Sequence, residues 1–563
     1  MRNLIISLLF CTSPCALAQG DVARGHELPL KIPPYLSGNF GELRSNHFHS
    51  GIDFKTQGVT GKPVYSFDDG WVSRIAVSPW GYGHALYISH YNGMTTVYAH
   101  LEAFSPAIAK IVKDYQYETE TFTFDKHFGK GEIPVKKGEL IAKSGNTGSS
   151  GGPHVHFEIR DTESEEPIDP LPFFMDKIKD TRKPELRSVR VYPLGGVVNG
   201  SNSPVTASLV KKEDGSVALD KTFTAWGKIG LGVKAYDRMD ETANIYGVKN
   251  IRLYVNDTLW FSFRANRFSF DKTRYLNSLT DYADWKKNKS MVMKLFVEPG
   301  NQLEEVYGQM IDKGVVDIRE EKIYRLRYEL ADAYGNKTTF KFNINGKRQA
   351  LPEPDLSGEN HFAWNRENRF EAPGFLMTFP RGAFYTDIDF NYKATPSPKW
   401  HSDIHQIHEN TTPLHLRCPV SIAINNDTVG DKSQYYLGTL RDGKASFVNA
   451  RYESGRMQSE IRDFGTYVVA KDDTPPVILP QAPDNWAKNR KITFKISDGH
   501  SGIREWRGTI DDRFALFEYD GKTATLTYRM DAERIGKEKK HKLELTVTDN
   551  CGNRKTYERS FYW

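Results

Sequence analysis

Hydrophobic and polar residues alternate in short runs along most of this chain, and glycine separates many of the runs. The runs 85–89 and 95–101 show the pattern, with glycine at positions 81, 83, 93, 145 and 148 among the breaks. Many short strands at regular spacing, with few helical patterns, are typical of β-sandwiches and barrels. The pattern therefore predicts an all-β fold. Segment 102–134 interrupts it and is rich in aromatic residues.

Successive side chains of a strand point to opposite faces, which divides two of these runs into a polar and an apolar face. In the run 154–159 the polar face carries His154, His156 and Glu158, and the core face carries Val155, Phe157 and Ile159. In the run 95–101 the same rule places Thr96, Tyr98 and His100 on the polar face and Val97, Ala99 and Leu101 inside. Histidines opposite an apolar face suit the wall of a groove, and we expect both polar faces to line one.

A repeated pattern begins at residue 180 and returns near the end of the chain. Residues 180–184 and 473–476 open the two copies with Asp-Thr and a following proline, and residues 332–336 and 549–553 close them with an Asp-x-x-Gly-Asn turn. A Gly-Asn turn between two alternating runs is typical of strands joined by a tight turn. The repeat predicts two immunoglobulin-like β-sandwiches.

These patterns divide the chain into segments. The expected boundaries are a signal peptide at 1–18, a β domain at 28–178 that contains the insertion 102–134, an immunoglobulin-like β domain at 181–350, a β domain of unknown role at 355–473 and an immunoglobulin-like β domain at 474–563. The proline-rich stretch 351–354 is expected to be a linker.

The first residues have the features of an export signal. Arg2 provides a positive start, residues 4–10 are apolar, and Ala16-Leu17-Ala18 offers a small-residue cleavage site. No later stretch reaches the roughly 18 apolar residues that a membrane helix needs. We therefore expect a protein that is exported through a cleavable signal peptide to the periplasm or cell envelope, without a transmembrane segment.

Charge and cysteine content narrow the classes of function. The net charge of +5 over 563 residues is small and the charges are mixed, so no nucleic-acid-binding surface is expected. Beyond the signal peptide only Cys418 and Cys551 remain. We expect two buried thiols, with a disulfide as the alternative that an exported protein allows.

Three residues of the first domain are candidate metal ligands. His49 and Asp53 would be about 13 Å apart in a straight strand, so the chain must bend for both to bind one ion. Gly51 allows such a bend. Together with His156 they would provide two nitrogens and one oxygen, with a fourth position open for water, which is the arrangement of a catalytic zinc.

Two further histidines, His100 and His154, remain for proton transfer. A neutral imidazole can take a proton from zinc-activated water and return it to a leaving amine. Each motif alone is a weak signal, because a single histidine in a strand is usually hydrogen-bonded or exposed. Another cluster, at 401, 405 and 408, has helical spacing but no helical apolar pattern around it, so an incidental surface run is favoured over a second metal site.

The segments together resemble the lysostaphin/LytM family of zinc metallo-endopeptidases, which have a duplicated hybrid motif fold of antiparallel sheets. The resemblance runs from about residue 40 to about residue 170 and includes Asp69-Gly70-Trp71-Val72, Tyr98-Ala99-His100-Leu101 and the block 145–158. It implies that His49, Asp53 and His156 bind one Zn²⁺ per chain and that His100 and His154 are the catalytic acid and base. His90 also belongs to the family pattern and is expected to be structural.

The resemblance also implies a substrate, the peptide part of peptidoglycan, cut in its cross-links or stem peptides. A D-alanyl–diaminopimelate cross-link and a glycine bridge both fit these residues. The alternatives are a catalytically inactive, cell-wall-binding activator of another hydrolase and an adhesin-like protein whose sandwiches do the work. The insertion 102–134 starts directly after His100-Leu101. Its aromatic residues favour a lid or specificity wall over the groove, with a peripheral hairpin as the alternative.

Overall fold

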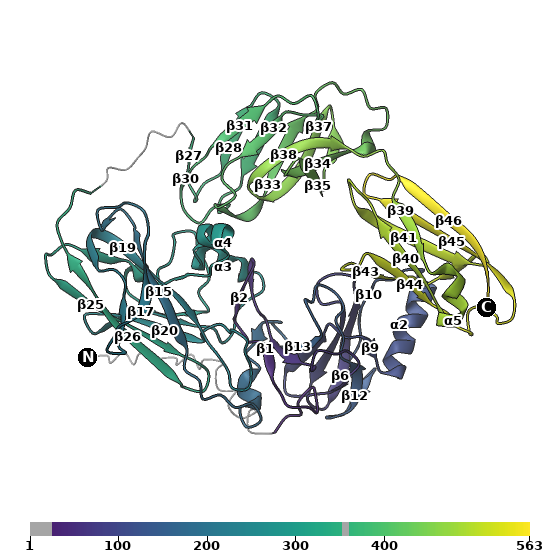
Figure 1. Ribbon diagram of the computed structural model, residues 1–563, viewed down its shortest axis with the longest axis horizontal. Helices are drawn as coiled ribbons and strands as arrows, with labels where there is room; N and C mark the ends of the chain where they lie inside the picture. Colours follow the sequence, from purple (N-terminus) through teal and green to yellow (C-terminus); the bar gives the residue numbers. More distant parts are fainter. Residues whose placement is uncertain (1–24, 352–359) are drawn as a thin grey trace, which may run out of the picture.

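The computed structural model describes residues 25–351 and 360–563, which form four β-rich parts arranged in a ring (Figure 1). The expected signal peptide and residues 352–354 of the expected linker lie outside the described residues. Strands are by far the most frequent elements, so the all-β prediction is confirmed. Among the helices of the described residues, none combines the length and the apolar character needed to cross a membrane.

The first part is built on two antiparallel sheets that share one core. The larger has the order β1 (Leu36–Gly38), β4 (Ile52–Lys55), β13 (His154–Asp161), β8 (Met94–Ala99), β7 (His84–His90), β6 (Gly70–Val77) and β10 (Phe124–His127). The smaller has the order β5 (Pro63–Tyr65), β12 (Leu140–Lys143) and β9 (Ala103–Phe104). Val155, Phe157 and Ile159 of β13 are fully buried in the core, which confirms the alternation predicted for that run.

The faces predicted for the run 95–101 are wrong. β8 pairs with β13 so that Tyr98 lies opposite Phe157 and Ala99 opposite His156. Residues that lie opposite one another share a face of the sheet. Tyr98 therefore points into the core, where its ring centroid is 5.3 Å from that of Phe157 and its hydroxyl accepts a hydrogen bond from Phe67 N–H at 2.7 Å.

The physical reason is that the strand is shorter than the alternating run. β8 ends at Ala99, and His100 has a φ of 60°, in the left-handed region. A strand-like alternation cannot be continued through such a residue. His100 thus reaches the polar face of the sheet by a backbone turn, while Val97 and Ala99 occupy that face within the strand.

The insertion 102–134 contains the longest helix of the described residues, α2 (Pro106–Glu118), followed by β10 and leading to β11 (Pro134–Val135). Pro106 stands in the first turn of α2, where its missing N–H costs no hydrogen bond. Ile108 and Val112 pack into the core. The aromatic rings pack within the insertion, as Tyr115 on Phe124, and against the last part of the chain, as Tyr117 on Phe514 and Phe122 on Trp506.

The second part is a sandwich whose two sheets share one long strand, β19 (Phe223–Tyr236). The first sheet pairs β19 with β15 (Glu185–Pro193), followed by β17 (Val205–Lys211) and β18 (Val217–Leu219). The second continues from β19 through β26 (Lys337–Gly346), β25 (Ile323–Ala331), β20 (Asn250–Val255), β21 (Thr258–Arg264) and β23 (Tyr307–Met310). Two short helices, α3 (Leu276–Leu279) and α4 (Tyr282–Asn288), lie between strands of this part.

The first copy of the repeat is closed by a hydrogen-bond network at the turn 332–336. Asn336 Nδ2 donates to the Asp332 carboxylate at 2.6 Å and to the backbone oxygen of Asp180 at 3.1 Å. The turn therefore ties the segment that enters the sandwich to its last hairpin. This long-range link gives a physical reason for the paired motifs in the sequence.

The second copy has the same network at the turn 549–553. Asn553 Nδ2 donates to the Asp549 carboxylate at 2.8 Å and to the backbone oxygen of Asp472 at 3.0 Å. Asp472, not Asp473, is thus the counterpart of Asp180. The opening motif begins one residue earlier than the sequence pattern indicated.

The third and fourth parts are also two-sheet sandwiches. One sheet of the third part has the order β28 (Asn368–Ala372), β29 (Phe375–Phe379), β33 (Pro413–Ala423), β37 (Arg456–Asp463) and β36 (Arg451–Glu453). The other has the order β31 (Tyr392–Thr395), β32 (Ile404–Ile407), β38 (Gly465–Lys471), β34 (Tyr435–Arg441) and β35 (Lys444–Val448). One sheet of the fourth part has the order β39 (Val477–Gln481), β40 (Lys491–Ser497), β44 (Thr525–Arg529) and β43 (Glu518–Asp520). The other has the order β42 (Arg513–Ala515), β41 (Ile503–Ile510), β45 (Lys540–Asp549) and β46 (Arg554–Tyr562). Cys418 and Cys551 are free and buried, as predicted.

The histidine cluster at 401, 405 and 408 is neither helical nor a surface run. His405 lies in β32, is 2% exposed, and has its Nδ1 2.7 Å from the Tyr392 hydroxyl. His408 is 9% exposed. The prediction of an incidental surface run is therefore wrong for these two residues, which pack inside the third part.

The fourth part folds back onto the first and closes the ring (Figure 1). Lys113 of α2 forms an ion pair with Asp531 at 2.5 Å, and Arg507 pairs with Glu120. The aromatic rings of Trp80 and Tyr519 also meet, with centroids 6.2 Å apart. The closing contact thus combines charged and aromatic side chains from the two ends of the chain.

Candidate active site

His49, Asp53 and His156 meet on the polar face of the large sheet. Their donor atoms all lie within 4.8 Å of one another. Asp53 Oδ1 is 3.1 Å from His49 Nε2 and 2.9 Å from His156 Nδ1. The antiparallel pairing of β13 with β4 places His156 opposite Asp53. The structure therefore brings together all three residues that the sequence marked as candidate ligands.

The chain bends between β3 (His47–Phe48) and β4, and the bend returns His49 to Asp53. Gly51 lies in this bend against β13. A Cβ atom on Gly51 would be 2.2 Å from the carbonyl oxygen of Phe157, which is far inside any real contact. The bend expected at Gly51 is present, and the absence of a side chain is required there by the close approach of a neighbouring strand.

The second nitrogen of each candidate histidine ligand has its own partner. His49 Nδ1 is 2.7 Å from the backbone oxygen of Asn39, and His156 Nε2 is 2.8 Å from Glu158 Oε1. With those nitrogens donating, His49 Nε2 and His156 Nδ1 present lone pairs to the shared centre. Metal-ligating histidines usually have a carbonyl or carboxylate partner of this kind. This donor set fits a zinc ion with one position left open.

The charge of Asp53 also suits a metal ligand. Burial by itself would raise the pKa of this carboxyl, but the adjacent rings of His49, His154 and His156 hold it well below its usual value. Asp53 is therefore ionised at neutral pH, as a carboxylate ligand must be.

Glu158 supports the site from behind, a role that the sequence did not reveal. Its side chain is fully buried and accepts hydrogen bonds from the Tyr82 hydroxyl at 2.6 Å and from Arg160 Nε at 2.6 Å. Burial opposes its ionisation, but Arg160 and His156 hold the pKa of Glu158 well below its usual range. The signal available in the sequence was its position two residues after His156 on the same face of β13.

His100 and His154 flank the three candidate ligands. Their ring centroids are 4.8 Å apart, and that of His100 is 5.9 Å from the ring of His156. His100 Nδ1 is 2.9 Å from the oxygen of Thr147, and His154 Nδ1 is 2.8 Å from the oxygen of Gly152. Each Nδ1 therefore donates its hydrogen to a carbonyl, which leaves Nε2 able to exchange a proton. Burial and the adjacent imidazoles lower the pKa of His100 to about 3.

His90 lies in the core rather than at this site. Its Nδ1 is 3.1 Å from the oxygen of Asp69, and its Nε2 is 2.8 Å from Thr96 Oγ1. Burial lowers the pKa of His90 to about 4, so the ring is neutral at physiological pH. These contacts agree with the structural role expected of it.

Two further groups of three carboxylates lie in the sandwiches, at equivalent turns of the repeat. They are Asp180, Asp237 and Asp332 in the second part and Asp472, Asp498 and Asp549 in the fourth. Burial, together with the nearby carboxylates of Asp332 and Asp180, raises the pKa of Asp237 to about 8. The titration of the first group is therefore coupled to the folding of the second part.

Two family models match parts of this chain. The model of peptidase family M23 matches residues 47–117 and 110–170, and that of the Zu5-like domain matches residues 359–472. The DD-carboxypeptidase/endopeptidase Mpg of Neisseria meningitidis serogroup B is 36% identical over 118 residues, 21% of this chain and 21% of that protein. The peptidoglycan DD-endopeptidase ShyB of Vibrio cholerae is 36% identical over 111 residues, 20% of each chain. This chain thus spans about a fifth of the length of these curated relatives.

Solved structures similar to part of the chain include two peptidases. The catalytic domain of lysostaphin from Staphylococcus simulans matches 25% of this chain and 91% of its own, at 24% identity and a TM-score of 0.19. A zinc containing peptidase from Vibrio cholerae matches 26% of this chain and 39% of its own, at 30% identity and a TM-score of 0.20.

Proposed function

Residues 47–170 form a domain of peptidase family M23, and from this premise we propose that the protein is an exported zinc metallo-endopeptidase that hydrolyses peptide bonds in peptidoglycan. The observation that carries the proposal is the meeting of His49, Asp53 and His156, with donor atoms within 4.8 Å of one another, beside His100 and His154. The names of the Neisseria and Vibrio relatives support peptidoglycan as the substrate. An exported enzyme would meet it in the periplasm or cell envelope.

The metal would be held by His49 Nε2, Asp53 Oδ1 and His156 Nδ1. When bound, zinc supplies a Lewis acid that makes water nucleophilic near neutral pH and polarises the carbonyl of the scissile peptide bond. Glu158 orients His156 by accepting its Nε2–H, and the oxygen of Asn39 does the same for the Nδ1–H of His49. The ligand atoms are thus directed before any ion binds, which limits the reorganisation needed for binding.

His100 and His154 would perform the proton transfers. Thr147 and Gly152 hold their rings through the Nδ1 atoms. A free Nε2 on one ring can accept the proton of the attacking water, and an Nε2–H can protonate the leaving amine. The centroids of the two rings are 4.8 Å apart, so both steps fit one bound peptide.

The zinc content and the activity of purified protein test this proposal. We expect about one zinc per chain and hydrolysis of purified peptidoglycan. His156→Ala should lose both, because it removes one of only three ligands. His100→Ala should keep the zinc and lose about 10²–10⁴-fold in rate, as expected on removal of a positioned acid or base. His127→Ala, which changes an exposed histidine of the insertion, should alter neither.

Each result has an opposing outcome. Full zinc occupancy in His156→Ala would show that the ligands are assigned wrongly, and normal activity in His100→Ala would remove that residue from the mechanism. A protein with neither zinc nor activity would instead be the inactive activator of another hydrolase. The bond that is cut can be identified by digesting cell walls that contain D-alanyl–diaminopimelate cross-links or glycine bridges and determining the masses of the fragments by mass spectrometry. The relatives named DD-endopeptidases favour the former.

A further inference from the structure

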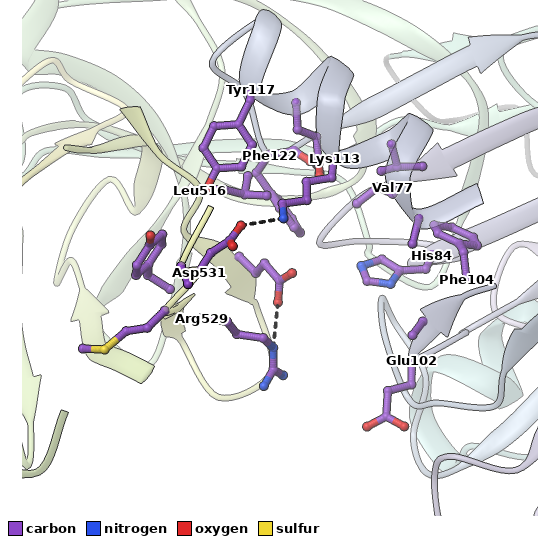
Figure 2. A pocket seen from close by; sticks show the side chains of 18 residues that line it. Val77, His84, Glu102, Phe104, Lys113, Tyr117, Phe122, Leu516, Arg529 and Asp531 are labelled. Atoms are coloured by element: carbon purple, nitrogen blue, oxygen red, sulfur yellow. Dashed lines mark hydrogen bonds and ion pairs between the residues drawn. The ribbon is translucent and has the colours of Figure 1, made fainter. Parts of the chain in front are cut away.

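A cavity of about 460 Å³ lies where the fourth part of the chain closes onto the insertion (Figure 2). One wall comes from α2 and the strands beside it, and the other comes from β43, β44 and the residues that follow β44. The Lys113–Asp531 ion pair bridges the two walls (Figure 2). Cavities of roughly 300–1,000 Å³ are typical of sites for small ligands. Closure of the ring therefore creates a site that neither part has alone.

The cavity begins at the rim of the candidate active site. Glu102, which lines it, stands two residues after His100. His84, another lining residue, donates its backbone N–H to Thr147 Oγ1 at 2.9 Å, and the carbonyl of the same threonine holds His100 Nδ1. Gly145 lies so close to Glu102 that a Cβ atom would be 2.3 Å from its backbone nitrogen. The cavity and the proton-transfer residues thus share one rigid segment.

Four of the five charged residues that line the cavity form ion pairs with one another, and Glu102 does not. Lys113 is paired with Asp531 at 2.5 Å, and Arg529 faces Glu518 at 3.8 Å (Figure 2). In the described part of the chain, the carboxylate of Glu102 has no ion pair and no hydrogen bond. Glu102 is exposed, so the edge of the cavity carries one negative charge that is available to a cation.

The rest of the lining is apolar or neutral. Val112, Leu516 and Met530 supply aliphatic surface. The buried Nδ1 of His84 has no hydrogen-bond partner among the described residues, and burial lowers the pKa of this histidine to about 4. A neutral ring beside Glu102 does not repel a cation. These features suit a ligand with an aliphatic stem and an ammonium group.

We propose that this cavity is a substrate subsite that binds the stem peptide of peptidoglycan and receives the side-chain ammonium of its diamino acid at Glu102. The inference rests on the proposed function, because it takes peptidoglycan as the substrate. A diamino acid offers the required aliphatic stem and ammonium group. The fourth part of the chain thereby becomes a wall of the substrate site, and Glu102 becomes a residue that determines which peptide is bound.

Calorimetric titration of the zinc-loaded full chain tests the subsite. The probes are a synthetic stem tetrapeptide with a free diaminopimelate side-chain amine and the same peptide with that amine acetylated; both lack the cross-link. The free-amine peptide should bind more tightly. Glu102→Gln should weaken its binding about tenfold, since a hydrogen bond to a charged group contributes roughly that much. Binding of the acetylated peptide should stay unchanged.

Two further variants define the site. Glu118→Gln also removes an exposed carboxylate from α2, but Glu118 does not line the cavity and forms no ion pair with the described residues of the fourth part, so it should leave both affinities unchanged. Leu516→Trp should fill the cavity and weaken the binding of both peptides. Circular dichroism and thermal unfolding identify any variant that fails to fold. If Leu516→Trp does not fold, the smaller substitution Leu516→Phe is used in its place.

The outcomes separate this inference from the proposed function. Equal affinity of the two peptides for the unaltered chain, or an equal response of both to Glu102→Gln, overturns the subsite. If the chain hydrolyses peptidoglycan but Glu102 has no effect on binding, the subsite alone is wrong. If Glu102-dependent binding is found in a chain that holds no zinc and cuts nothing, the subsite stands and the proposed hydrolysis is wrong.

Discussion

At the scale of single residues, Glu158 orients the proposed metal ligand His156 through a hydrogen bond. Glu158→Gln keeps the size of the side chain but removes the charge that accepts the Nε2–H at 2.8 Å. We expect zinc affinity to fall about 10–100-fold, as is usual when the partner of a ligating histidine is lost. Competition with a chromophoric chelator measures this affinity. Glu163→Gln, an exposed change after the same strand, should leave the zinc affinity unchanged. An unchanged zinc affinity in Glu158→Gln would contradict the proposed role of Glu158.

At the scale of elements, the meeting of β4 and β13 depends on Gly51. Gly51→Ala would put a Cβ atom 2.2 Å from the oxygen of Phe157, so the strands must separate and His49 must move from His156. We expect the free energy of unfolding to fall by about 1–3 kcal/mol, the usual cost of overpacking, together with loss of zinc. Denaturant unfolding and metal analysis measure the two effects. Gly151→Ala is the matched control, because a Cβ atom there meets nothing within 4 Å. Similar behaviour of the two variants would show that the close approach is unimportant.

The carboxylate group Asp180, Asp237 and Asp332 predicts a pH dependence for the second part. The pKa of Asp237 is raised to about 8, so the folded state binds its proton more tightly than the unfolded chain, where aspartate titrates near 3.9. The stabilisation from this proton is complete below about pH 4 and is lost as the pH rises through about 8. Asp237→Asn removes the titrating group. The melting temperature of this variant, relative to that of the unaltered protein, should therefore increase as the pH is raised from about 4 to about 8. For Asp214→Asn, on an exposed turn, the difference in melting temperature from the unaltered protein should not change with pH. A difference that also stays constant with pH for Asp237→Asn would refute the coupling.

At the scale of the whole molecule, the ring is closed by contacts between the insertion and the fourth part. Lys113→Glu would place a negative charge beside Asp531 and Glu533, which now lie 2.5 and 3.6 Å from the lysine. We expect the ring to open, because like charges at such distances repel. Small-angle scattering should show a larger radius of gyration, and adding Asp531→Lys should reverse the change. An unchanged radius in Lys113→Glu would mean that the aromatic contacts alone hold the ring closed.

The sequence by itself determined the features that depend on neighbours along the chain. The choice of His49, Asp53 and His156 as candidate metal ligands follows from residue types and motif, and the shared face of His156 and Glu158 follows from the two-residue period of a strand. The all-β fold and the repeated Asp-x-x-Gly-Asn turn were readable for the same reason, because turn residues act locally. These features need no knowledge of what packs against them.

Only the tertiary structure decided the features that depend on segments far apart in the chain. Tyr98 faces the core because β8 pairs with β13 in one register and His100 leaves the strand, and a run of alternating residues does not specify either. The Lys113–Asp531 contact and the cavity beside Glu102 join residues hundreds of positions apart. Local patterns carry no periodic signal for such pairs, because packing of whole parts, rather than the geometry of a single strand, brings them together.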